Sequence, residues 1–204
     1  MSNARNLSKL LGSSTSVPAS NMADGSLILL HAVALGVAAS EIAFNNTYIN
    51  VTYDDYLMIG KSVTPATDGA EPLIRVSTDN GSSFGVNCDN GRQYTPLHTN
   101  TSQGIEINRY TDGSSIQLAT DLGNDANQGA NFHAHFFGLN STSFQKFMFY
   151  QTIAKHQSIE YKWDGGANME TTNAINYLEF KFSSGNVAAG ARIALYGIKG
   201  SNHA

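Results

Sequence analysis

Apolar and polar residues alternate in short runs along most of the chain after residue 26. Successive side chains of a strand point to opposite faces, so this period of two predicts half-buried strands. The clearest run predicts Leu178, Phe180 and Phe182 on the inward face, with Tyr177, Glu179 and Lys181 on the outward face. Roughly eight to ten such runs, separated by turn signals and by no helical rhythm, predict an antiparallel sandwich or barrel.

Two turn sequences predict hairpins. DNGSS, at residues 79–83, follows an alternating run, and TDGSS, at residues 111–115, lies between two further runs. Asn-Gly and Asp-Gly readily adopt the left-handed backbone that tight hairpin turns need. We therefore expect each turn to join two strands that pair with one another.

The first 26 residues differ from the rest of the chain. NARNLSKLLG can form about two helical turns with Leu7, Leu10 and Leu11 on one side. A Ser-rich linker follows it. A helix this short is not stable alone in water, so it needs a docking partner. We expect residues 1–26 to form a helical or extended arm with a linker, and residues 27–204 to form one β-sandwich domain.

Composition narrows the classes of function. Charged residues are 14% of the chain and the net charge is −4, so no basic field favours nucleic acid. The chain holds 20 Asn, 21 Ser, 15 Thr and 19 Gly, which favour turns and short strands over helices. The apolar run at residues 27–39 is too short to span a bilayer, so we expect a core strand or a packed segment and no membrane insertion. The single cysteine, Cys88, excludes an intramolecular disulfide.

The stretch IALYGIKG, at residues 193–200, is apolar on both alternating faces. We expect Ile193 and Leu195 to join the core with Phe180 and Phe182. Tyr196 and Ile198 then face the other way, where they would pack either under a loop or, as a candidate oligomer interface, against a neighbouring subunit, and Gly197 would permit a close backbone approach there.

Few residues suggest a reaction centre. His133 and His135 share one face of a predicted strand and are weak metal candidates, because a metal needs further ligands; two histidines on a polar face are the simpler interpretation. The oxygen-rich segment at residues 121–129 lacks the EF-hand pattern and reads as a polar turn. No nucleophile elbow or phosphate-binding loop is present, so we expect neither an enzyme nor a cofactor.

Aromatic residues in turn-rich segments offer another kind of site. Tyr94, Tyr110 and Trp163 are candidate sugar contacts, because ring stacking and neighbouring polar groups together suit a saccharide. A place in the core or in a subunit interface explains the same residues equally well.

Three segments together resemble a known family. They are residues 45–84, with YDDYL, P-A-T-D and STDNGSSF in order; residues 171–200, with SGN and LYGIK; and the start NARNLSKLLGSS. This order resembles the tip domains of phage tail fibres and virion fibres, particularly those of marine podovirus-like phages. The resemblance implies a non-enzymatic, jelly-roll-like β-sandwich, usually a homotrimer, located on the virion as part of a tail fibre, head fibre or capsid decoration.

The resemblance also implies roles for individual residues. The arm would anchor the protein to other virion proteins through Asn3, Arg5, Leu7, Leu10 and Leu11, and Tyr94, Tyr110 and Trp163 would contact a host-surface glycan. We expect a short tail fibre or tip subunit for host attachment. A capsid decoration, cement or head-fibre protein is the alternative, and a lyase, a glycosidase or a cellular lectin-like module are the competing classes.

Overall fold

The fold was analysed in a computed structural model, which describes residues 22–98 and 106–200. These two segments contain strands and no helix. The strands are β1 (Leu27–Ala34), β2 (Glu41–Phe44), β3 (Tyr56–Val63), β4 (Pro72–Ser77), β5 (Cys88–His98), β6 (Glu106–Gly113), β7 (Ile116–Gln117), β8 (Gly129–Phe137), β9 (Lys146–His156), β10 (Ile159–Met169), β11 (Tyr177–Phe182) and β12 (Arg192–Ile198). The predicted all-β class is therefore confirmed.

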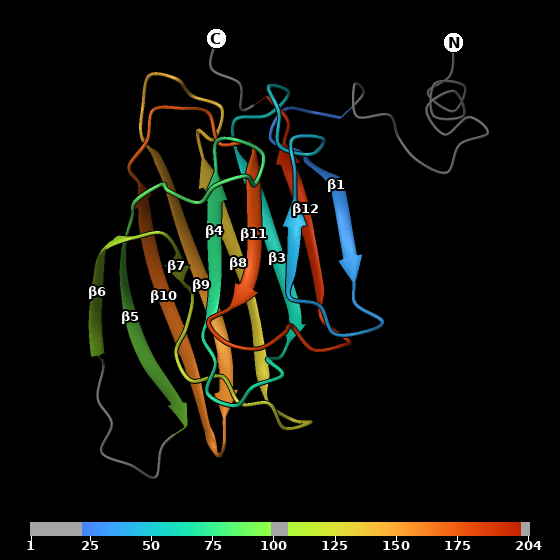
Figure 1. The fold of residues 1–204 in the computed structure, drawn as a ribbon, viewed down its shortest axis with the longest axis vertical. Helices are drawn as coiled ribbons and strands as arrows, with labels where there is room; N and C mark the ends of the chain where they lie inside the picture. The colour runs from blue at the N-terminus through green and yellow to red at the C-terminus, as the bar shows by residue number, and fades with distance from the viewer. Residues whose placement is uncertain (1–21, 99–105, 201–204) are drawn as a thin grey trace, which may run out of the picture.

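The strands form two antiparallel sheets that pack face to face as a sandwich (Figure 1). The larger sheet has the order β1-β12-β3-β8-β9-β10-β5-β6, and the smaller has the order β2-β11-β4-β7. The strands β1, β12, β3 and β8 of the larger sheet, together with the whole smaller sheet, reproduce the two four-stranded sheets of a jelly roll. The β5–β6 pair is inserted between β4 and β7, and the β9–β10 pair between β8 and β11, so both insertions extend the same sheet.

The core lies between the two sheets, where the alternation predicted it. Leu178, Phe180 and Phe182 are fully buried, and Ile193 and Leu195 of the closing strand pack into the same core. Phe180 stacks on Phe132 of the larger sheet, with ring centroids 5.3 Å apart. Aromatic pairs of this kind add to the stabilisation from apolar burial.

Glu179 faces outward from the smaller sheet as predicted, yet its side chain is fully buried. Arg75 on the neighbouring strand β4 forms a two-pronged ion pair with it, and the Phe84 ring lies 3.9 Å from the Arg75 guanidinium carbon. Burial raises the pKa of Glu179, as does the nearby Glu41 carboxyl. The outward position is therefore covered by side chains that alternation alone does not predict.

Both hairpin predictions are wrong. The backbone at Asn80 and Gly81 is left-handed as the turn sequence requires, with φ of 58° and 85°. However, β4 pairs with β11 and β7, whereas β5 pairs with β10 and β6 in the other sheet. The TDGSS turn likewise leads from β6 in the larger sheet to β7 in the smaller one. Each turn crosses between sheets, because turn chemistry sets the chain direction and packing selects the pairing partner.

The apolar run at residues 27–39 forms β1 and a following loop. β1 lies at the edge of the larger sheet, where it pairs with β12, and all of its side chains are at least partly exposed. The run is therefore an edge strand and not a core strand, and Leu30, Val33 and Leu35 pack against the core while partly buried. Within the described ranges, no helix is long and apolar enough to cross a membrane.

The two ends of the sandwich differ. At one end, which we call the entry end, residues 22–26 meet residue 199 and loop 45–55, through the bonds Gly25 N–H to Lys199 O and Ile198 N–H to Asp55 O. Loops 138–145 and 170–176 join this end through the bonds from Leu139 to Asp54 and from Ile175 to Leu139. The proposed anchor residues Asn3, Arg5, Leu7, Leu10 and Leu11 lie outside the described residues.

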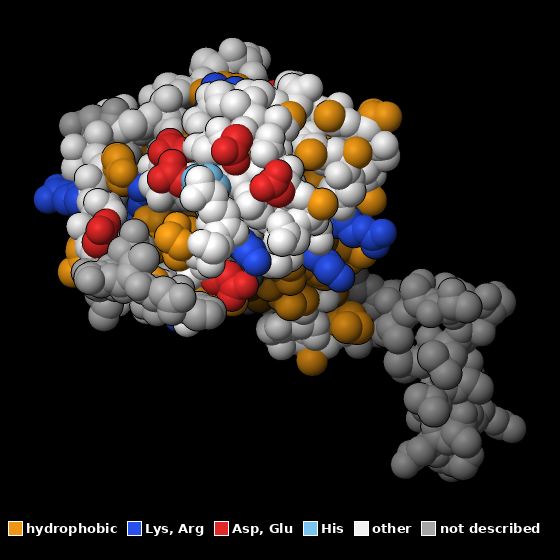
Figure 2. Space-filling model, turned by 90° about the horizontal axis from the view of Figure 1, so that it is seen from below, with side chains coloured by type: hydrophobic (Ala, Val, Ile, Leu, Met, Phe, Trp, Pro, Cys, Tyr) orange, Lys and Arg blue, Asp and Glu red, His pale blue; other side chains and the backbone are white. Residues whose placement is uncertain are grey.

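The opposite end, which we call the far end, carries loops 35–40, 64–71, 120–128 and 183–191. Isolated bridges from Val187 to Ala39 and Pro65, and from Ala70 to Leu122, hold these loops together. Figure 2 looks onto this end and shows Asp and Glu side chains gathered there. The far end thus carries Asp and Glu side chains together with Lys and Arg, on the side of the molecule opposite residues 22–26.

Candidate functional site

The larger sheet has one face that points away from the smaller sheet, which we call the outer face. On β1, β12, β3, β8 and β9, most side chains at its outward positions are apolar or aromatic, and we call this part the apolar half. Its apolar members are Leu27, Leu29, Ala32, Ala34, Leu57, Ile59, Phe137, Phe147, Phe149, Ile153, Ala194, Tyr196 and Ile198. On β10, β5 and β6 the outward positions are mainly polar or glycine.

The apolar half is continuous across strands. Cross-strand pairing sets Leu29 beside Tyr196, Tyr196 beside Leu57, Leu57 beside His135, and His135 beside Phe149. Five strands about 4.8 Å apart and roughly 25 Å long give a footprint on the order of 500 Å². Apolar side chains hold most but not all of this footprint, and continuous apolar patches of a few hundred Å² are often functional.

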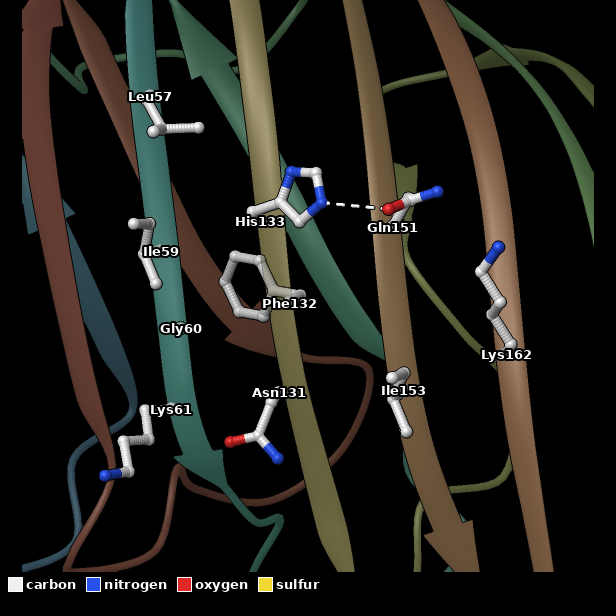
Figure 3. A pocket seen from close by; sticks show the side chains of 10 residues that line it. All are labelled: Leu57, Ile59, Gly60, Lys61, Asn131, Phe132, His133, Gln151, Ile153 and Lys162. Atoms are coloured by element: carbon white, nitrogen blue, oxygen red, sulfur yellow. Dashed lines mark hydrogen bonds between the residues drawn. The ribbon is translucent and has the colours of Figure 1, made fainter. Parts of the chain in front are cut away.

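A shallow hollow of about 540 Å³ lies within this face (Figure 3). The outward side chains of Leu57, Ile59 and Ile153 give it an apolar surface, and polar groups of β3, β8, β9 and β10 surround them. The residues that line it are Leu57, Ile59, Gly60, Lys61, Asn131, Phe132, His133, Gln151, Ile153 and Lys162. Apolar walls with a few polar groups are typical of a surface that receives an apolar side chain.

A chain of hydrogen bonds crosses the polar side of the hollow. His133 Nε2 lies 3.1 Å from Gln151 Oε1, and Gln151 Nε2 donates to Asp164 Oδ1 at 2.6 Å. Asp164 in turn pairs with Lys162 at 2.9 Å. Because the Gln151 amide nitrogen faces a carboxylate, its oxygen is the acceptor and His133 carries a proton on Nε2. The network fixes the orientation of His133 at the edge of the apolar half.

His135 belongs to the apolar part of the face. Its ring lies 4.1 Å from the Phe137 ring centroid and 5.3 Å from that of Phe149. Burial lowers the pKa of His135, so the neutral ring is favoured. His133 and His135 share a face as the sequence predicted, but no group of three or more His, Cys, Asp or Glu in residues 22–98 and 106–200 could hold a metal.

Tyr196 and Ile198 lie in the apolar half, where they are half-buried. Their neighbour Gly197 does not face outward with them. A Cβ atom at Gly197 would come within 2.6 Å of the Tyr53 ring, so the close approach that glycine permits is to this chain's own tyrosine. The close approach at Gly197 is therefore to loop 45–55 of the same chain.

The three candidate sugar contacts are brought together by a residue that the sequence did not single out. The Arg92 guanidinium carbon lies 4.6 Å from the Tyr110 ring and 4.7 Å from the Trp163 ring, and Tyr94 lies 4.9 Å from Trp163. Tyr94 and Trp163 are 5% and 3% exposed, whereas Tyr110 is 44% exposed. Nothing in the sequence around Arg92 signals this position, because it depends on the pairing of β5 with β6 and β10.

Comparison with known proteins adds no assignment: no family model, no curated protein and no solved structure matches this chain. The function is therefore argued from the outer face, the aromatic cluster and the two ends of the sandwich.

Proposed function

We propose that the protein is a structural protein of a phage virion, a short tail fibre or tip subunit that displays a homotrimeric β-sandwich for attachment to a host surface. The observation that carries this proposal is the apolar half of the outer face. Of the twelve exposed large apolar side chains among the described residues, six lie there: Leu27, Leu29, Ile59, Phe147, Phe149 and Ile153. Such a concentration marks an interaction surface rather than the scattered exposure of ordinary monomers.

A second copy of this chain is the partner that we propose for the apolar half. Its outward positions carry no Asp or Glu, so the apolar halves of three copies can meet around a three-fold axis without burying an unpaired carboxylate. A stable interface buries about 800 Å² on each partner, so the apolar half would form the centre of the contacts and the surrounding polar residues their rim. Tyr196 and Ile198 would lie inside this interface.

The jelly-roll strand order supports the same class of protein. Jelly rolls recur in viral capsid and lectin domains, although a fold by itself does not assign a function. The entry end, where residues 22–26 lie, suits an arm that anchors the domain to other virion proteins. The far end then faces away from the particle and toward a host.

The subunit contact is tested by light scattering on the purified chain. We expect the protein to be trimeric and Tyr196→Lys to shift it toward monomer, because a lysine ammonium would be buried in the interface. Gln93→Lys, on the polar half of the same face, is the matched control and should stay trimeric. A Tyr196→Lys protein that remains trimeric with unchanged melting would remove this residue from the interface.

The anchoring role is tested on particles. Deletion of residues 1–20 should leave a folded trimer that no longer joins the virion, and normal incorporation of the truncated protein would overturn the role of the arm. Imaging of virions labelled at the C-terminus separates a tail position from capsid decoration.

A further inference from the structure

Four segments that are distant in sequence build a small pocket of about 170 Å³ toward the far end of the sandwich, which we call the far pocket. Its lining consists of Tyr94 from β5, Glu106 from β6, Thr120 and Asp121 from the loop after β7, and Tyr161 and Trp163 from β10. All but Thr120 and Asp121 belong to the two inserted strand pairs. The basic jelly roll therefore lacks this pocket, and the insertions create it.

One wall of the far pocket is aromatic. Tyr161 lies 5.1 Å from Tyr94, and Tyr94 lies 4.9 Å from Trp163, measured between ring centroids. Tyr94 is thus held between two rings, whereas Tyr161 contacts only one ring among the described residues and is partly exposed. Tyr161 is the ring whose face can pack against the C–H groups of a ligand, and the buried pair behind it keeps it rigid.

The remaining lining is made of oxygen acceptors. Glu106 and Asp121 contribute exposed carboxylates and Thr120 a hydroxyl. Carboxylates accept strong hydrogen bonds from hydroxyl and amine groups, and the two charges repel an anion. Asp121 has a left-handed backbone, with φ of 48°, a conformation that non-glycine residues rarely adopt and that clusters at binding sites.

The aromatic wall also holds an unused donor. The indole Nε1–H of Trp163 has no hydrogen-bond partner among residues 22–98 and 106–200, and the side chain is only 3% exposed. A buried donor without an acceptor is costly, and such groups mark positions where water or a ligand supplies the missing oxygen. This observation is independent of the two carboxylates.

We propose that the far pocket binds a ring of a non-acidic saccharide, neutral or amino-bearing, and excludes acidic sugars. A sugar ring offers an apolar C–H face to Tyr161 and hydroxyl donors to Glu106 and Asp121. Its oxygens can accept a hydrogen bond from the Trp163 Nε1–H. The inference rests on the proposed host-attachment function, because it gives the host-facing end its ligand. Among the three candidate sugar contacts, Tyr94 and Trp163 support the pocket, while Tyr110 lies beyond Arg92.

The test uses the purified full chain. Trp163 is the single tryptophan, so its fluorescence reports directly on the pocket. The probes are oligosaccharides of glucose, galactose and N-acetylglucosamine, with sialyllactose and an oligouronate as acidic counterparts, at up to about 10 mM. We expect a saturable change with at least one non-acidic probe and at least about tenfold weaker binding of the acidic ones. Saturation-transfer NMR on the sugar protons detects binding that leaves the fluorescence unchanged.

Two variants locate the binding. Tyr161→Ala should weaken it about tenfold or more, and Asp121→Asn should weaken it while reducing the discrimination against acidic sugars. Phe144→Ala, which removes a 74% exposed aromatic side chain from a loop of the entry end, is the matched control and should bind as the unmodified chain does.

Three results would overturn the proposed saccharide site. No saturable signal by either method with any non-acidic probe, equal affinity for acidic probes, or unchanged affinity in a folded Tyr161→Ala variant would each overturn it. These measurements need neither particles nor a trimer. A chain that binds sugar but stays monomeric would instead contradict the proposed assembly, so the two failures are distinguishable.

Discussion

Lys146 offers the sharpest test of how the entry end is held together. It is the first residue of β9 and its side chain is fully buried. The ammonium donates to the carbonyl oxygens of Ser141 at 2.6 Å, Phe144 at 3.1 Å and Thr171 at 3.1 Å. Burial lowers the pKa of Lys146, so the three carbonyls offset a real cost of desolvation. The side chain joins loop 138–145 to the segment after β10.

Substitution of Lys146 by Met keeps the length of the side chain and removes the donors. Hydrogen bonds to a charged group contribute about 1.5–3 kcal/mol each, and the lost burial of the ammonium offsets part of that sum. We expect the free energy of unfolding to fall by about 3–5 kcal/mol and the melting temperature by roughly 10 °C. Denaturant titration and thermal unfolding by circular dichroism measure both quantities.

The matched control lies on the same strand. Lys155 is partly exposed and lies 3.7 Å from Glu160, so Lys155→Met removes only a surface ion pair, which contributes at most about 1 kcal/mol. A Lys146→Met protein within about 1 kcal/mol of the unmodified chain would refute the argument, because it would mean that the three carbonyls find other partners at little cost.

Three further outcomes follow from the structure. Gly60→Ala should lower the free energy of unfolding by about 1–3 kcal/mol, because its Cβ would lie 2.1 Å from the Phe132 ring. A Cβ at Gly91 would have no atom within 4 Å, so Gly91→Ala should leave the stability unchanged, and equal denaturation midpoints for the two variants would contradict this. Burial raises the pKa of Cys88 to about 12, so a thiol reagent should label it only after unfolding, and rapid labelling of native protein would show otherwise. Hydrogen bonds from the Ser77 and Ser83 hydroxyls lower the pKa of Asp79 to about 2. The ionised Asp79 therefore stabilises the folded protein above about pH 4, and this contribution is lost as the pH falls through 2. Asp79→Asn should make the free energy of unfolding depend less on pH in this range.

Alternation was a reliable guide where a strand has one buried face. The inward residues of β11 and of β12 are those that the period of two selected, because burial on one face forces that pattern on the sequence. It was a poor guide to β1, the most apolar stretch. That strand is apolar and yet exposed, since it lies at a sheet edge and contributes to the outer face. A run of apolar residues therefore does not by itself show that the segment lies in the chain's own core.

The candidate sites divide in the same way. The sequence placed Tyr196 and Ile198 on the outward face of the last strand, and β12 has them there. It did not single out Arg92 or Glu106, and it placed Asp121 only in a polar turn, because these residues approach the aromatic side chains only when the two inserted strand pairs lie side by side. Local composition carries no signal of that contact.

The sequence by itself determined the all-β class, the alternating strands and the residues that face the core, since these follow from the two-residue period of a single strand. The tertiary structure alone decided which strands share a sheet, and hence that both Gly-containing turns cross between sheets. It also decided that the apolar outward residues of five strands join into one face and that the far pocket exists. Strand pairing is a contact between segments distant in the chain, and its free energy depends on packing against the opposite sheet rather than on either segment alone.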